Sequence, residues 1–193
     1  AIMRKEAFAT SGPRLKVRFF GGYDFGNHPD EGNWLPNAYK AGVPMGGDLP
    51  TAPEGAAPVF IVHAMKEADG ANLDRIQIIK GYVDANGDPQ EVVYDVALSD
   101  DRTNGAEPVG NTVDAEDATY TNAIGDPELR VVWTDPNFDP DQPSFYYARV
   151  LQIPTPRWST YDAVRTGLEI PDGLPVSIQE RAWSAPIWYT PEG

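Results

Sequence analysis

The sequence predicts a mainly β protein, specifically an antiparallel β-sandwich of roughly seven strands with long loops and a few short helices. The 193-residue chain carries 19 Pro and 18 Gly without a repeat, which is typical of many turns. Short apolar segments with the two-residue period of strands lie between these turns. Five Trp, nine Tyr and seven Phe can build a packed interior, so we expect one well-formed core.

The first 13 residues, AIMRKEAFATSGP, place apolar side chains at helical spacing before a Thr-Ser-Gly-Pro cluster that stops a helix. No capping residue precedes them. We therefore interpret residues 1–13 as the tail of a preceding domain and a linker, and residues 14–193 as a C-terminal β-sandwich domain. Residues 15–20 alternate apolar and basic side chains, which predicts the first strand of that domain.

The next part of the chain contains one long loop and the clearest hairpin signal. Residues 26–55 are crowded with turn formers and predict a surface excursion, whereas residues 58–65 are apolar on both faces and predict an inner strand. Residues 75–83 and 91–98 flank Asn86-Gly87, and an Asn-Gly pair between two apolar runs predicts a β-hairpin. The alternation in its second arm predicts one buried face.

Residues 100–117 are polar and acidic and predict a loop, after which residues 119–124 predict a short strand. Asp126-Pro127-Glu128 combines a capping Asp, a Pro at the first helical position and an acid in the first turn. We therefore expect a short helix over residues 129–133.

The last third of the chain predicts the longest strand. Residues 144–153 (SFYYARVLQI) alternate throughout, so we expect a central strand there. A proline-bracketed excursion follows, with a short helix expected over residues 161–165. Residues 182–189 predict a closing strand in which Pro186 marks an edge position or a bulge.

Composition excludes several classes of partner. The formal net charge of −14, from 29 acidic and 15 basic residues, repels phosphate backbones, so we expect no nucleic acid partner. No apolar run approaches the length of a membrane-spanning helix, so we expect no membrane insertion. The absence of cysteine excludes disulfides, thiolate catalysis and Cys-ligated zinc, and leaves the cellular compartment undetermined.

The histidines and acidic turns contain no strong metal motif. His28 and His63 are too isolated for a catalytic metal centre. The run from Asp84 to Asp88 begins like a calcium loop, but Pro89 replaces the glycine that such a loop needs, so the hairpin interpretation is favoured. Weak calcium candidates remain in a stretch of short Asp-Pro turns, where the alternative is solvated loop residues; they are Asp135, Asp139 and Asp141.

Aromatic residues supply a second candidate site. Exposed rings in one plane would form a sugar-stacking platform, whereas core packing is the alternative use of the same residues. The candidates are Trp34, Tyr39, Trp158, Tyr161, Trp183 and Trp188. The sequence contains no phosphate-binding glycine loop, no nucleophile elbow and no assembled Ser-His-Asp set. We therefore assign it no catalytic residue and no cofactor, and leave open whether it is an enzyme.

Four stretches carry a family resemblance: AFATSGPRLKVRFFGGYDF, GVPMGGDLP with DGANLDRIQIIKGYVD, FYYARVLQIPTPRWSTYDA, and IQERAWSAPIWYTP. From Ala1 to Pro191 the chain resembles the C-terminal part of bacterial proteins of domain-of-unknown-function family 3604. Those proteins in turn resemble PHP-type (polymerase and histidinol phosphatase) metallohydrolases. The resemblance implies a longer, exported metal-dependent hydrolase whose His- and Asp-rich centre, with a divalent metal, precedes this chain.

On that basis we expect a non-catalytic accessory domain whose partner is the N-terminal catalytic domain. The alternative is an independent module that binds carbohydrate or another extracellular ligand. Thr10, Ser11 and Arg14 lie where the two domains would join, and Arg14 could place a positive charge beside an anionic substrate. The competing interpretation is that Gly12 and Pro13 only shape a turn and that Arg14 makes an ion pair.

Overall fold

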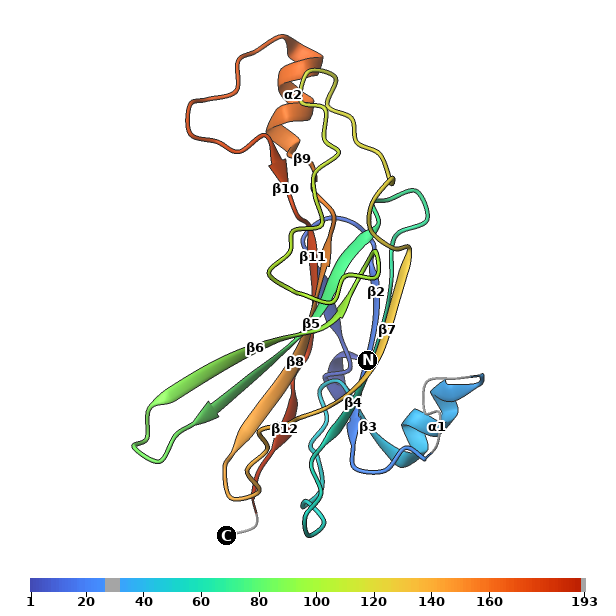
Figure 1. The fold of residues 1–193 in the computed structure, drawn as a ribbon, viewed down its shortest axis with the longest axis vertical. Coiled ribbons are helices and arrows are strands. Elements are labelled where there is room, and N and C mark those ends of the chain that lie inside the picture. Colours follow the sequence, from blue (N-terminus) through green and yellow to red (C-terminus); the bar gives the residue numbers. More distant parts are fainter. Residues whose placement is uncertain (27–31, 192–193) are drawn as a thin grey trace.

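Two antiparallel sheets packed face to face form the fold in the computed structural model, which describes residues 1–26 and 32–191 (Figure 1). The larger sheet contains, in order, β1 (Phe8–Thr10), β11 (Arg181–Ser184), β8 (Ser144–Gln152), β5 (Leu73–Val83) and β6 (Pro89–Leu98), with β12 (Ile187–Tyr189) also paired to β8. The smaller sheet contains β3 (Gly42–Pro44), β2 (Lys16–Gly22), β4 (Val59–Met65) and β7 (Glu128–Thr134). The remaining elements are a 3-10 turn η1 (Ile2–Arg4), α1 (Trp34–Ala41), β9 (Thr155–Pro156), α2 (Trp158–Thr166) and β10 (Ser177–Ile178).

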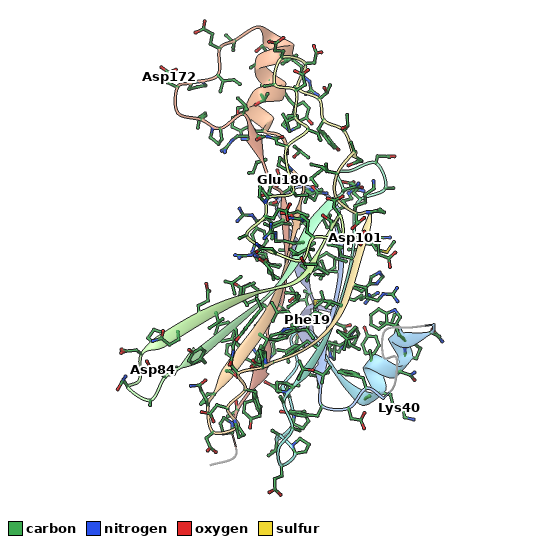
Figure 2. All side chains as sticks on the ribbon, viewed as in Figure 1. Phe19, Lys40, Asp84, Asp101, Asp172 and Glu180 are labelled. Carbon is green, nitrogen blue, oxygen red and sulfur yellow. The ribbon has the colours of Figure 1, made fainter. Side chains whose placement is uncertain are left out.

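Aromatic side chains join the inner faces of the two sheets. The Phe60 ring centroid lies 5.5 Å from that of Phe19 in the same sheet and 4.5 Å from that of Tyr146 in the opposite sheet. All three side chains are fully buried, and each buried ring contributes about 2–3 kcal/mol of hydrophobic stabilisation. Figure 2 places Phe19 in this central layer. The predicted antiparallel β-sandwich is therefore confirmed.

The strands with clear two-residue periodicity form where the sequence predicts them. β2, β4 and β8 cover the three predicted alternating or apolar segments, and β8 lies between β5 and β11 as the expected central strand. β5 and β6 form the predicted hairpin, and the turn between them includes Gly87 at a φ of 88°. The closing segment is interrupted at Pro186 and contributes two short strands, β11 and β12, to β8.

The N-terminal segment does not form the predicted helix. A single 3-10 turn, η1, is followed by β1, in which Phe8 pairs with Ser184 and Thr10 with Ala182. The edge of β11 offers free backbone groups, and pairing with them outweighs the weak helical pattern. The assignment of residues 1–13 to a preceding domain and linker stays a prediction.

The predicted helix over residues 129–133 is wrong, because β7 occupies this segment. Val131 pairs with Val62 of β4, and Leu129, Val131 and Trp133 pack into the core. Asp126, the expected helix cap, instead exchanges backbone hydrogen bonds of 2.8 and 3.0 Å with Leu73. Strand pairing and core burial therefore outweigh a local helix-start signature.

Two loop predictions also need correction. The expected excursion over residues 26–55 contains α1 and β3, and α1 packs Trp34 and Ala38 against Phe20 and Ile61 on the outer face of the smaller sheet. The expected strand over residues 119–124 is only an isolated bridge between Thr119 and Asp114. The short helix expected at residues 161–165 does form, within α2.

Residues 155–178, which comprise β9, α2 and β10, form a projection that we call the α2 arm. Figure 1 shows the α2 arm extending beyond one end of the sandwich, with the tip of the β5–β6 hairpin at the other. Within the arm, the Arg157 N–H and the Thr160 hydroxyl both donate to the Val176 carbonyl, at 2.9 and 2.7 Å. No helix among the described residues is long and apolar enough to cross a membrane.

Candidate functional site

The three calcium candidates do not share one environment. Asp135 is buried, and its carboxylate accepts hydrogen bonds of 2.7 Å from the Lys80 ammonium and the Tyr146 hydroxyl. Asp139 and Asp141 lie exposed in the following turn, where Asp139 accepts the Asp141 N–H at 3.0 Å. Within residues 1–26 and 32–191, no three His, Cys, Asp or Glu side chains are grouped so that they could hold a metal ion.

His63 and Asp84, the other residues considered as metal ligands, make local protein contacts. His63 lies 2.7 Å from a Glu128 carboxylate oxygen; burial raises the pKa of Glu128, but this contact and Arg130 outweigh burial and lower it. Asp84 accepts the N–H groups of Asn86 and Asp88 at 2.9 and 3.0 Å, as a hairpin turn requires. His28 lies outside the described residues.

The segment from Thr10 to Arg14 is fixed to the body of the sandwich. The Ser11 hydroxyl donates to the Glu180 carboxylate and accepts the Arg181 N–H at 2.8 Å. The Arg14 N–H donates to the Glu67 carboxylate at 3.1 Å. The Arg14 side chain is exposed and makes no ion pair with any described residue, so its charge is free to meet a further group.

A cavity of about 360 Å³ connects this segment with the α2 arm. Gly12 and Pro13 line one part of it, and Trp158 and Tyr161 of α2 line another. Tyr120 also lines the cavity; burial, and then the neighbouring Tyr161 and Glu67, raise the pKa of the Tyr120 hydroxyl. The candidates Thr10, Ser11 and Arg14 do not themselves line this cavity, but they flank Gly12 and Pro13, which do.

The α2 arm exposes an unusual number of large apolar side chains. Trp158 is 68% exposed and Leu168 is 71% exposed. Three further large apolar residues of the arm are exposed, namely Val164, Leu174 and Val176. Exposed apolar side chains gathered on one projection of a fold favour an interaction site there.

Two polar atoms at the start of α2 lack hydrogen-bond partners. The Arg157 Nε and the Ser159 Oγ are both buried and find no partner in the part of the chain that the structure describes. An unsatisfied buried donor costs about 1–3 kcal/mol, so such groups call for a partner. Sequence reasoning missed both residues, because an unpaired group becomes visible only when all its spatial neighbours are known.

The six aromatic candidates fall into three separate places. Trp34 is buried at the start of α1, and Tyr39 lies on the same helix and donates to the Glu6 carboxylate. Trp158 and Tyr161 lie on α2. Trp183 and Trp188 lie on the outer face of the larger sheet, where Phe145 and Tyr147 of β8 join them. The alternation of SFYYARVLQI predicts the position of Phe145 and Tyr147, because it places both rings on the face of β8 opposite Tyr146.

Comparison with known proteins identifies one family. Residues 1–191 match the family described as "Protein of unknown function (DUF3604)". No curated protein and no solved structure matches the chain.

Proposed function

This chain belongs to the family of proteins of unknown function DUF3604, and we propose that it is a non-catalytic accessory domain that packs against a metal-dependent hydrolase domain. The resemblance of that family to PHP-type metallohydrolases implies that the longer protein is exported and that its hydrolase domain holds a divalent metal. On the strength of that resemblance, we assign the divalent metal to the hydrolase domain.

The α2 arm carries this proposal. Its exposed Trp158 and Leu168 present apolar surface to solvent, and Arg157 and Ser159 leave buried polar atoms unsatisfied at the start of the same helix. Packing against a second surface would bury the apolar side chains. The exposed apolar side chains of the arm therefore favour a partner at this end of the sandwich.

The hydrolase domain of the same polypeptide is the occupant we propose for that surface. Gly12 and Pro13 line the same cavity as Trp158, so a domain connected through residues 1–13 lies within reach of the arm. The Arg14 guanidinium, exposed and without an ion pair among the described residues, would face an anionic group across this interface. These features support an arrangement in which the accessory domain borders the hydrolase site.

Hydrogen exchange tests this arrangement. We expect backbone amides of residues 155–178 to exchange more slowly in the longer polypeptide than in the 193-residue chain, because docking covers the arm. The double variant Trp158→Ser/Leu168→Ser should remove that difference. Val83→Ser is the matched control, since Val83 is an exposed apolar residue at the far end of β5. Equal exchange of the arm in both proteins would contradict the proposal.

A further inference from the structure

The outer face of the larger sheet carries a row of aromatic rings at the end opposite the α2 arm. Phe145 of β8 is paired in register with Trp188 of β12, and their ring centroids lie 5.1 Å apart. Tyr147 follows on the same face of β8, with its ring inclined only 14° to that of Phe145 and 6.5 Å from it. Trp188 is 42% exposed, so this row is open to solvent.

A hollow of about 590 Å³ lies beside these rings. Its walls include Phe145, Trp188 and Tyr82, and its polar groups include Gln90, Glu91 and Thr190. This volume falls within the range of small-ligand sites, which combine apolar walls with a few polar groups that fix orientation.

Gly81 shapes the hollow. A Cβ atom at Gly81 would lie 2.2 Å from Cζ of Phe145, which is far inside van der Waals contact. The absence of a side chain therefore allows the Phe145 ring to lie over the backbone of β5, as rings do over glycines in sheets. Any larger residue at position 81 would push Phe145 away and reshape the site.

The chemistry of the lining indicates the ligand class. Among the described residues that line the hollow, Glu91 is the only charged one, and the chain has a net charge of −14, so an anionic ligand is repelled. Exposed aromatic faces carry partial negative charge and attract the polarised C–H groups of a sugar ring. The Glu91 carboxylate can accept hydrogen bonds from sugar hydroxyl groups, and the Thr190 hydroxyl can both donate and accept.

We propose that this hollow binds a neutral oligosaccharide, with a pyranose ring stacked on Trp188 and Phe145 and its hydroxyl groups hydrogen-bonded by Glu91 and Thr190. The site goes beyond the proposed docking function and uses a separate surface. A domain built in this way holds a glycan at one end and contacts the hydrolase domain at the other. Failure of either proposal leaves the other intact, because Trp188 and Trp158 lie on different elements.

Affinity electrophoresis of the chain tests the site. The protein would be run in native gels that contain barley β-glucan, xylan, galactomannan or soluble starch, because its net charge of −14 gives it mobility. We expect at least one of these polysaccharides to retard it, and Trp188→Ala or Phe145→Ala to weaken binding about tenfold or more, as loss of an aromatic anchor does. Val132→Ala, at an exposed apolar residue of β7 in the other sheet, is the control and should bind normally.

Two further variants separate loss of the site from loss of the fold. Trp188→Phe should retain part of the retardation, because it keeps a stacking ring, whereas Gly81→Val should abolish it by displacing Phe145 while unfolding remains cooperative. Mobility unchanged by all four polysaccharides would overturn the proposal. Retardation that Trp188→Ala leaves intact, or saturable binding of polygalacturonate or choline in place of a neutral glycan, would overturn it as well.

Discussion

Removing the charge of Asp135 should be one of the most destabilising single changes in the chain. The side chains of Lys80 and Asp135 are only 3% and 0% exposed, and Asp135 accepts hydrogen bonds of 2.7 Å from Lys80 and from Tyr146. In Asp135→Asn no negative charge would remain beside the Lys80 ammonium, whose other hydrogen-bond acceptor is the neutral Asn137 carbonyl at 2.7 Å. Breaking a buried pair by removing one member costs about 3–5 kcal/mol, because an uncompensated charge stays buried.

Chemical and thermal unfolding measure that cost. For a chain of this size each kcal/mol corresponds to about 2–4 °C, so we expect the Tm of Asp135→Asn to fall by about 6–20 °C. Asp141→Asn, in the exposed turn of the same loop, should change stability by less than about 0.5 kcal/mol.

The double variant Lys80→Met/Asp135→Leu should recover most of the loss, because a buried ion pair replaced by apolar residues is often neutral. A loss below about 1 kcal/mol in Asp135→Asn would refute the reasoning, since it would mean that the pair is solvated.

Two further predictions concern an interaction at the N-terminus and a glycine. The hydrogen bond from Tyr39 lowers the pKa of Glu6 below its ordinary 4.5, so the stability it provides is present above that pH and is lost as the pH falls through the lowered value. In a pH series of melting curves, Tm should therefore fall less steeply below about pH 4.5 for Tyr39→Phe than for the unaltered chain. An unchanged slope would count against this contact. Gly125 has a φ of 74°, and a Cβ there would lie 2.7 Å from the Leu73 carbonyl oxygen, so Gly125→Ala should cost about 2 kcal/mol or more. Gly87→Ala, at a φ of 88° with no atom within 4 Å of an added Cβ, is its control in urea unfolding and should cost less.

Local patterns predicted the interior of the fold well. The segments that became β4, β8 and the β5–β6 hairpin each carry a strong period or a turn whose residues favour positive φ, so local preference and tertiary pairing agree. At β7 they disagree. Asp126-Pro127-Glu128 is a good helix start, yet the open edge of β4 and the burial of Trp133 decide the outcome.

The candidate site could be predicted only in part. Thr10, Ser11 and Arg14 were identified through the family resemblance, but the cavity that Gly12 and Pro13 share with α2 joins residues about 145 positions apart, which periodicity does not encode. The role of Asp135 was missed for the same reason, because its partner Lys80 is 55 residues away. The unsatisfied Arg157 and Ser159 atoms are properties of three-dimensional packing alone.

The central claim is that this chain is an accessory domain of a metal-dependent hydrolase. The most direct test is to measure metal content together with phosphoesterase and carboxylesterase activity, in parallel preparations of the longer polypeptide and the 193-residue chain. We expect bound metal and turnover in the longer polypeptide only. Stoichiometric metal or turnover in the 193-residue chain alone would contradict the claim and would direct attention to its Asp-rich loops.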